Sequence, residues 1–472
     1  MSDFELTHID AELQAPMKGL CRTRNGDQTT GVWEGWNGSA NTETSEIFVA
    51  ATLSRTLRSS PYWSTLSHKT MRHVLPGFLV SSLGDGMSVV AVGWLAIELA
   101  PSGHRGLWVA IAAAAYTLPG ALGVLLLGRF LRHRGPAQLV CWDAVLRACA
   151  LGAIPTVYVF GLLSIELYVA LLAASSVLHS WGEAGLYTLV ARVLPEHDHL
   201  AGNALLSTIG SFTTVVGPAL AGPLIAWSGA ATVLAVDAAT FVVLAVTFQS
   251  MVPTTVAAEK DTAEDEVSSA SGFNVIRRNR TLLGLLTLSA GYFFLFGPVY
   301  VALPLHVSED LHGSANLLAA FYSAFGIGAV IGGMLAGYLS RWALWPTIIG
   351  IVIGFGTVML PLGLGASTVV ALVGFALAGL LWPPYSTLSM ALFQRSTPPA
   401  QLPQVLAATS SVRVLAVPLG TALGGPLVAL FGTGAALRFC AMAIVVLGFT
   451  AATAMALRSA AARRSCRWLV GR

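Results

Sequence analysis

The chain has 472 residues, of which 55% are hydrophobic and only 10% are charged, and its formal net charge is +3. A soluble domain carries about 25% charged residues, so this composition excludes a protein whose whole surface faces water. No patch of basic and aromatic residues accompanies the small positive charge, and we expect no nucleic-acid partner.

The first 70 residues are mostly polar and precede the apolar part of the chain. They are rich in Ser, Thr, Gly and Asn, and they lack the sustained apolar run of a secretory signal. This composition predicts a disordered cytoplasmic tail over residues 1–70. The five cysteines of the chain show no CxxC or Cys/His pattern, so we expect neither a disulfide framework nor a metal site. No cofactor is indicated.

About twelve apolar stretches follow, each near the roughly 20 residues that a membrane helix needs. They are too long and continuous for the alternating strands of a membrane barrel. The sequence therefore predicts an all-α polytopic membrane protein. The expected spans are 74–98, 107–128, 137–160, 167–190, 200–227, 231–251, 281–304, 317–339, 343–364, 368–393, 405–430 and 434–457.

A polar segment interrupts this pattern after the sixth span and divides the chain into two halves. Because each half has six helices, an even number, both should have the same orientation in the membrane, related by an axis along its normal. The expected parts are a first six-helix lobe over 71–250, a cytoplasmic central loop over 251–280, a second six-helix lobe over 281–457 and a basic cytoplasmic tail over 458–472.

An internal repeat relates the two halves. Residues 219–226 read ALAGPLIA, and residues 422–429, 203 positions later, read ALGGPLVA. A second and weaker echo, 209 positions apart, pairs residues 123–132 with residues 332–341. Two echoes in the same order indicate that one half was copied into the other.

The repeated phrase lies in the fifth and eleventh expected helices. Small residues let helix backbones approach closely, and proline kinks a helix. Such helices suit an interface that slides between conformations, although static packing explains the same pattern. The residues concerned are Gly217, Pro218, Gly222, Gly420 and Gly425.

Lysine and arginine are distributed unevenly between the loops. The positive-inside rule then places both termini and the central loop in the cytoplasm. We expect the chain to lie in the plasma (inner) membrane. The opposite loops hold essentially only Arg105, with Arg438 near a helix end. The residues on the cytoplasmic side are Arg129, Arg132, Arg134, Arg192, Lys260, Arg277, Arg278, Arg280, Arg341, Arg395 and the five arginines after residue 457.

The position of the lysines limits the energy sources that could drive transport. Its three lysines, Lys18, Lys69 and Lys260, do not belong to a GxxxxGK[ST] phosphate-binding loop. ATP hydrolysis by that route is therefore excluded, and transport would be facilitated or driven by an ion gradient.

Ionisable residues inside the apolar stretches are costly, so each is a candidate for function. After Asp310 the sequence contains no Asp or Glu. Any carboxylate that carries protons through the membrane is therefore expected in the first lobe. The intramembrane charges are Asp85, Asp143, Arg147, Glu183 and Asp237 in the first lobe, and Arg413 and Arg438 in the second.

Three of these carboxylates are candidates for proton coupling. Glu183 is favoured by its depth in the fourth helix, because intramembrane carboxylates form the proton relays of pumps and transporters. Asp85 lies between two glycines, and coupling and a structural role are equally open for it. Asp143 and Arg147 are four residues apart on one helix face and are expected to pair as a structural charge network. Asp237 is expected in a polar network.

Arg413 has no acid in the helices of its own lobe. It must meet carbonyl groups, water, a first-lobe acid or a substrate anion, so it is a candidate for substrate binding or switching. Aromatic residues of the seventh and tenth helices could pack together or line a pocket for an apolar, ring-bearing ligand. They are Tyr292, Phe293, Phe296, Trp382 and Tyr385.

Several motifs have counterparts in a known family. They include SSLGDGMSVVAVGWLAIEL, WDAVLRA, ARVLPEHDHLAGNALL, GPALAGPLIAWSG and YFFLFGPVYVALPLHV. With them the chain resembles the major facilitator superfamily, and within it drug:proton antiporter-type exporters with macrolide, tetracycline and siderophore-efflux relatives. GPALAG resembles the antiporter signature GPxxGG. The loop after the second helix keeps the basic residues Arg129 and Arg132 but lacks the acid with which the family locks its lobes.

The resemblance implies a secondary transporter that exports a small, largely apolar organic compound by proton antiport with alternating access. The expected partners are this substrate, protons and the lipid bilayer, and we expect a monomer. A carrier of the same fold for a lipid or a nutrient is an alternative, as is a non-transporting receptor. A membrane enzyme would have to use His179 with Glu183, but no GxSxG motif accompanies them, and we do not expect an enzyme.

Overall fold

The computed structural model describes residues 63–101, 103–131, 134–251, 269–339, 341–398 and 401–470. Every regular element within these ranges is a helix. Twelve helical spans in them are long and apolar enough to cross a membrane. The expected all-α polytopic fold is confirmed.

The first lobe contains six spans, of which the fourth is divided into two helices near Val177. Its fifth span is preceded by a short 3-10 turn, η1 (Glu196–Asp198). The helices are α3 (Met71–Leu99), α4 (Arg105–Leu131), α5 (Pro136–Val159), α6 (Ile165–Ser176), α7 (His179–Val193), α8 (His199–Ser228) and α9 (Ala230–Met251).

The second lobe also contains six spans, and its first span is divided near Pro298, which has no N–H to donate within a helix. That span consists of α11 (Arg280–Phe296), α12 (Val299–Leu305) and a π-helical turn, η2 (His306–Asp310). The others are α13 (Ala315–Leu339), α14 (Leu344–Gly363), α15 (Thr368–Arg395), α16 (Leu402–Phe431) and α17 (Thr433–Val470).

Three segments expected to be tails or loops are helical in part. A short helix, α2 (Trp63–Ser67), precedes α3, and the Ser64 hydroxyl donates to Asp198 at 2.5 Å. In the expected central loop, α10 (Ser269–Arg278) buries Ile276 and packs against α16. The last helix continues through the expected C-terminal tail to Val470. The remainder of the expected tail, residues 1–62, and residues 252–268 lie outside the described residues.

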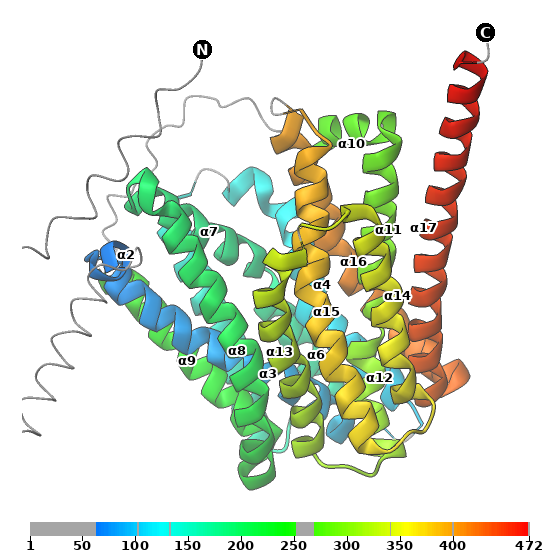
Figure 1. Ribbon diagram of the computed structural model, residues 1–472. Helices are drawn as coiled ribbons and strands as arrows, with labels where there is room; N and C mark the ends of the chain where they lie inside the picture. The colour runs from blue at the N-terminus through cyan, green and yellow to red at the C-terminus, as the bar shows by residue number, and fades with distance from the viewer. Residues whose placement is uncertain are drawn as a thin grey trace, which may run out of the picture. The chain divides into compact units, whose positions relative to one another are not determined.

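The connections between spans fall on two faces of the bundle. The first face carries α10, the connections after α4, α7, α13 and α15, and the C-terminal end of α17. Figure 1 shows α10 and the end of α17 at this same end. The second face carries the connections after α3, α5, α8, η2, α14 and α16. Both lobes therefore run in the same direction across the bundle.

The repeat in the sequence corresponds to equivalent packing in the two lobes. In the first lobe, a Cβ added at Gly217 on α8 would lie 2.6 Å from the Cα of Gly86 on α3. In the second lobe, a Cβ at Gly420 on α16 would lie 3.2 Å from the Cα of Gly297, next to α11. Gly229 and Gly432 then end the two helices with positive φ values of 85° and 80°. The duplicated segment thus performs the same packing twice.

The repeat also forms the contact between the lobes. Helix α8 packs along α13 and α4 packs along α16 (Figure 1). A Cβ at Gly222 would lie 2.7 Å from the Cβ of Ala319, and one at Gly425 would lie 2.7 Å from the Cβ of Ala110. Ala110 and Ala319 are 209 positions apart, which is the spacing of the second echo. The two interlobe contacts are therefore equivalent.

The lobes meet toward the second face. The contacts of Gly222 and Gly425 involve the second-face ends of α4, α8, α13 and α16. Across the same face, Arg105 Nη1 lies 3.7 Å from Glu309 Oε1. Nearer the first face, Gly210 on α8 and Gly337 on α13 have open space where a side chain would lie.

Candidate functional site

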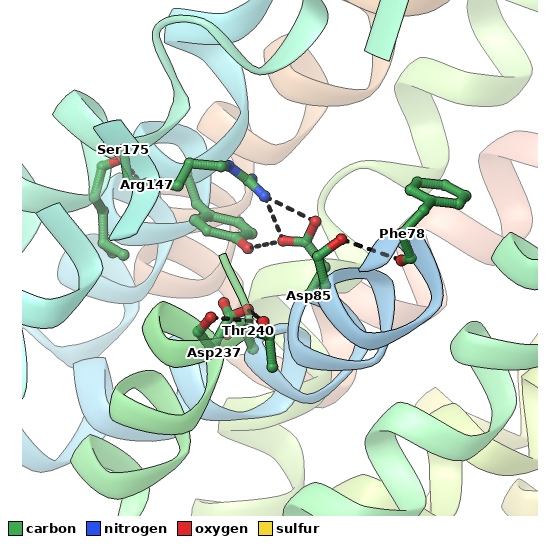
Figure 2. A network of polar contacts seen from close by, with 10 residues as sticks. Phe78, Asp85, Arg147, Ser175, Asp237 and Thr240 are labelled. Atoms are coloured by element: carbon green, nitrogen blue, oxygen red, sulfur yellow. Dashed lines mark hydrogen bonds and ion pairs between the residues drawn. The ribbon is translucent and has the colours of Figure 1, made fainter. Parts of the chain in front are cut away.

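An ion pair between two helices of the first lobe forms the centre of the site. Arg147 on α5 donates from Nη1 to both carboxylate oxygens of Asp85 on α3, at 2.6 and 2.8 Å. The hydroxyl of Tyr116 on α4 donates to Asp85 Oδ1 at 2.7 Å. Figure 2 shows the guanidinium of Arg147 directed at the carboxylate of Asp85. Three helices thus share one carboxylate.

The two members of this ion pair differ in exposure. The side chain of Arg147 is 2% exposed, whereas that of Asp85 is 32% exposed. The Arg147 guanidinium carbon also lies 4.6 Å from the ring centre of Phe241 and 5.6 Å from that of Tyr116. Aromatic faces attract a cation at such distances. The cation is therefore held inside the lobe, and the carboxylate is the more accessible member of the pair.

A second carboxylate, Asp237 on α9, lies fully buried beside the ion pair (Figure 2). Ser88 on α3 donates to its Oδ2 at 2.5 Å. The hydroxyl of Thr240 lies 3.4 Å from its Oδ1. The expected place of Asp237 in a polar network therefore agrees with its contacts, and its hydrogen bonds come from hydroxyl groups.

Arg147 forms its hydrogen-bonded ion pair with Asp85 rather than with Asp143, the partner expected from the sequence. Asp143 is buried, and its Oδ1 has no hydrogen-bond partner among the described residues. Its carboxylate lies against Gly182 of α7. A spacing of four residues does place both side chains on one face of α5. However, the long side chain of Arg147 extends across the lobe to Asp85 instead.

Glu183, the carboxylate favoured from the sequence, lies on α7 with an exposed side chain. It takes no part in the hydrogen-bonded cluster of Asp85, Tyr116 and Arg147. The two candidates for proton coupling therefore differ in their surroundings. Asp85 on α3 is paired with Arg147, whereas Glu183 on α7 is not part of that ion pair.

The glycines on either side of Asp85 bring neighbouring helices against it. A Cβ at Gly84 would lie 3.2 Å from the Cα of Asp237 on α9. A Cβ at Gly86 would lie 3.2 Å from the Cα of Gly217 on α8. The backbone at Asp85 is thus in close contact with α8, which is one of the two first-lobe helices at the interlobe contact.

The aromatic candidates of the second lobe pack against one another. Ring centres lie 4.3 Å apart for Tyr292 and Tyr385, and 4.7 Å apart for Phe296 and Trp382. Tyr292, Phe293, Phe296 and Tyr385 are buried. These five residues, which we call the aromatic cluster, therefore pack together, and two of them, Phe293 and Tyr385, also line a cavity.

Arg413 lies at the edge of the aromatic cluster. Its side chain is exposed, and its guanidinium carbon is 5.1 Å from the ring centre of Phe293. It borders a small cavity of about 20 Å³ between α11, α15 and α16. The cavity is lined by Leu286, Ser289, Phe293, Tyr385, Ser386, Ser389, Met390, Phe393, Thr409, Ser410, Val412 and Arg413.

A larger and apolar groove of about 510 Å³ runs along α4 and reaches α16. Its size is that of sites for drug-sized molecules. Among the described residues that line it, none carries a charged side chain; they are Leu107, Ala110, Ile111, Ala114, Ala115, Leu118, Pro119, Leu122, Gly123, Leu126, Leu127, Val177, Ala422 and Pro426.

The remaining sequence predictions concern Arg129, Arg132, Pro218 and a metal site. The side chain of Arg129 and the whole of Arg132 lie outside the described residues. Pro218 is buried within α8, beside Gly217. Within the described ranges, no three His, Cys, Asp or Glu side chains gather as metal ligands would.

Sequence reasoning missed the groups that complete the Asp85 site. Tyr116, Phe241 and Thr240 belong to helices whose relative positions the sequence does not define. Ser88 lies three residues after Asp85 and therefore near the same face of α3, so a polar stripe was visible there. The residues of α9 that contact this stripe could not be identified from the sequence.

Comparisons with known proteins agree with this architecture. The family model described as Major Facilitator Superfamily matches residues 74–421. The uncharacterized MFS-type transporter y4rN of Sinorhizobium fredii is 27% identical over 73% of this chain and 85% of its own length. The multidrug efflux pump Tap of Mycolicibacterium fortuitum is 24% identical over 80% of this chain and 94% of its own length.

A solved structure gives a similar result for the fold. The nucleoside transporter NupG superposes with a TM-score of 0.66 and covers 81% of this chain and 98% of that one. The identity is 12%, so this likeness concerns the fold alone. The matching family is one of transporters, which points away from an enzyme.

Proposed function

Because the chain belongs to the major facilitator superfamily, we propose that it is a secondary transporter that exports a small, largely apolar organic compound in exchange for protons. Support for export comes from its likeness to a multidrug efflux pump. Support for proton exchange comes from the ion pair between Asp85 and Arg147, the observation on which the proposal chiefly rests. In this proposal the first face is cytoplasmic, because basic residues gather there.

Asp85 is the proposed proton carrier because it is the solvent-accessible member of the ion pair. Protonation of its carboxylate removes the charge that compensates Arg147. Removing one partner of a buried ion pair costs about 3–5 kcal/mol. The buried guanidinium then needs a new arrangement of the surrounding helices, so proton binding is coupled to a change of conformation.

The backbone contacts of Asp85 give this change a route to the lobe interface. Gly86, the next residue, packs against Gly217 of α8. Further along α8, Gly222 packs against Ala319 of the second lobe. A displacement of α3 at the ion pair therefore acts on a helix that holds the lobes together. Alternating access in this family of folds requires one lobe to rock against the other.

The groove along α4 supports an apolar substrate. It is large enough for a drug-sized molecule, and its lining offers hydrophobic contact without charges. Its position beside the contact between α4 and α16 places it where rocking of the lobes changes its shape. An apolar compound in the bilayer has direct access to such a surface.

A vesicle experiment tests the proposal. A drug-susceptibility panel in an efflux-deficient bacterial host first identifies a compound to which the chain confers resistance. The full chain is then reconstituted in liposomes with an imposed pH gradient. We expect the gradient to drive movement of that compound, and the Asp85→Asn variant to lose this response entirely.

Glu98→Gln is the matched control, because Glu98 is an exposed acid on the same helix. It should leave gradient-driven transport intact. If the wild-type chain responds to the gradient and Asp85→Asn responds equally, Asp85 is not the carrier. Glu183→Gln in the same assay then shows whether the exposed carboxylate on α7 takes that role.

A further inference from the structure

The small cavity beside Arg413 combines a cation with many hydroxyl groups. Ser289, Tyr385, Ser386, Ser389, Thr409 and Ser410 all line it. No carboxylate is among its lining residues. The chain contains no Asp or Glu after Asp310, so the second lobe offers Arg413 no acid beyond Glu309 and Asp310 at its second-face end.

Arg413 lies well inside its membrane span. The span begins at Gln404, and nine residues of helix correspond to about 14 Å along the axis. A charge at that depth is expensive and marks a functional position by default. An anion that reaches it from outside the chain compensates that cost. The guanidinium has a planar fork of donors that suits a carboxylate.

The cavity also contains a polar group without a partner. The Ser389 side chain is 5% exposed, and its Oγ has no hydrogen-bond partner among the described residues. A buried hydroxyl without a partner carries a desolvation cost that a ligand can relieve. Ser289 and Tyr385, in contrast, already bond each other at 2.9 Å. Ser389 thus lines the same cavity as the cation and offers a hydroxyl donor there.

The size of the cavity limits what it can hold. A volume of about 20 Å³ has room for about one water molecule. It therefore suits the acidic group of a larger molecule whose apolar body remains outside, next to the exposed face of Arg413. The aromatic cluster, whose member Phe293 lies under the guanidinium, keeps the fork of Arg413 in place.

We infer that Arg413 and Ser389 form the acid-binding part of the substrate site, and that the exported compound is an apolar, ring-bearing molecule with a carboxylate. This inference rests on the proposed export function and specifies the substrate class. The equivalent position in the first lobe, 203 residues earlier, is Gly210. Recognition of the acidic group therefore belongs to the second lobe alone.

A binding measurement with matched ligands tests this inference. The full chain is placed in nanodiscs without a pH gradient, and binding of pyrene-1-carboxylate is compared with that of pyrene-1-carboxamide, with empty nanodiscs as the blank. A hydrogen-bonded charge contact corresponds to a preference of about tenfold or more for the acid. Arg413→Gln should abolish that preference, and Arg413→Lys should retain part of it.

Two further variants sharpen the comparison. Ser389→Ala should weaken binding of the acid by about threefold, because one neutral hydrogen bond is lost. Arg395→Gln removes the same charge at the end of α15, and it should leave the preference unchanged. Equal binding of acid and amide by the wild type, no binding of the acid, or a preference that survives in Arg413→Gln overturns the inference.

The test separates this inference from the proposed function. Binding without a pH gradient does not depend on proton coupling, so Asp85→Asn should keep the acid preference. A chain that prefers the acid but never responds to a pH gradient contradicts the proposed antiport and supports the acid-binding site. A chain that uses the pH gradient to transport a neutral compound but shows no acid preference supports the proposed antiport and contradicts the acid-binding site.

Discussion

Asp85, Tyr116 and Arg147 form a hydrogen-bonded group in the first lobe that we call the polar cluster. It and the aromatic cluster of the second lobe occupy equivalent places in a duplicated scaffold. Gly86 packs against Gly217 in the first lobe, and Gly297 packs against Gly420 in the same way in the second. Positions on α3 therefore correspond to positions 211 residues later in the α11–α12 span. At this offset Asp85 corresponds to Phe296. The ion-paired carboxylate of one lobe is thus a buried phenyl ring in the other.

The correspondence extends to the partners of Asp85. Tyr116 corresponds to Phe325 at the offset of 209 residues that relates α4 to α13. The hydroxyl of Tyr116 bonds Asp85 in the first lobe. In the second, the ring centres of Phe325 and Phe296 are 5.9 Å apart. The same two helix positions meet in both lobes, once through a hydrogen bond and once through aromatic packing.

Asp237 follows the same rule. It corresponds to Cys440 at the offset of 203 residues, and both side chains are buried. The residues that shape the scaffold are conserved between the halves as glycines, whereas the residues that carry charge are not. Duplication therefore supplied two copies of a framework, and the interiors diverged. In the proposed function this difference corresponds to a division of labour, with proton chemistry in the first lobe and recognition of the acidic group of the substrate in the second.

Arg147→Gln should give the largest effect on this comparison, because it removes the buried cation from the polar cluster. We expect loss of gradient-driven transport and a loss of about 1.5–3 kcal/mol in stability, because hydrogen bonds to a charged group are lost and the remaining carboxylate of Asp85 is 32% exposed. The double variant Asp85→Asn with Arg147→Gln should recover part of that stability without recovering transport. Thermal unfolding in detergent and the vesicle assay measure the two quantities. Additive losses of stability would show that the pair is not coupled.

Phe296→Ala makes the matched change at the equivalent position of the second lobe. Removing a buried phenyl ring costs about 3 kcal/mol, so the unfolding temperature should fall clearly. The response of transport to a pH gradient should remain, because no proton carrier is touched. The ratio of transport with and without the gradient is the decisive measurement. If that ratio falls to one while the protein stays folded, the aromatic cluster takes part in coupling and the division of labour is wrong.

The duplication, the twelve spans and the packing role of the repeated glycines could be derived from the sequence, because each depends on local pattern. The partner of Arg147 could not. The spacing of Asp143 and Arg147 gave a local reason for pairing, while Asp85 lies on another helix, 62 residues away. The group that a long side chain contacts depends on how the helices are arranged in space. A single sequence does not define that arrangement.

Arg413 shows the opposite case. The absence of acids after Asp310 already identified it as a cation without a partner in its lobe. The contribution of the structure is the surroundings: a small cavity with several hydroxyl groups and the unpartnered Ser389. Whether aromatic residues pack together or line a pocket also depends on how the helices are arranged in space, because helical spacing alone suits both arrangements.

The ion pair between Arg105 and Glu309 offers the mildest way to test the equivalence of the two halves. At an offset of 211 residues Glu309 corresponds to Glu98, and at 209 Arg105 corresponds to Ser314. The charge pair thus exists on one side of the pseudo-symmetric interface, while its counterpart combines an acid with a serine. The second face is therefore held together unequally.

Glu309→Gln should favour opening of the second face slightly. Arg105 and Glu309 are 42% and 39% exposed and lie 3.7 Å apart, and exposed pairs contribute about 0.2–1 kcal/mol. The population of the closed state should therefore fall by less than about fivefold. Spin labels at Leu162 and Leu364, both exposed on second-face connections, report the separation of the lobes. Glu98→Gln should leave that distance distribution unchanged, since Ser314 offers no cation. An equal shift in both variants would mean that acids act on this face through their charge alone and not through the contact with Arg105.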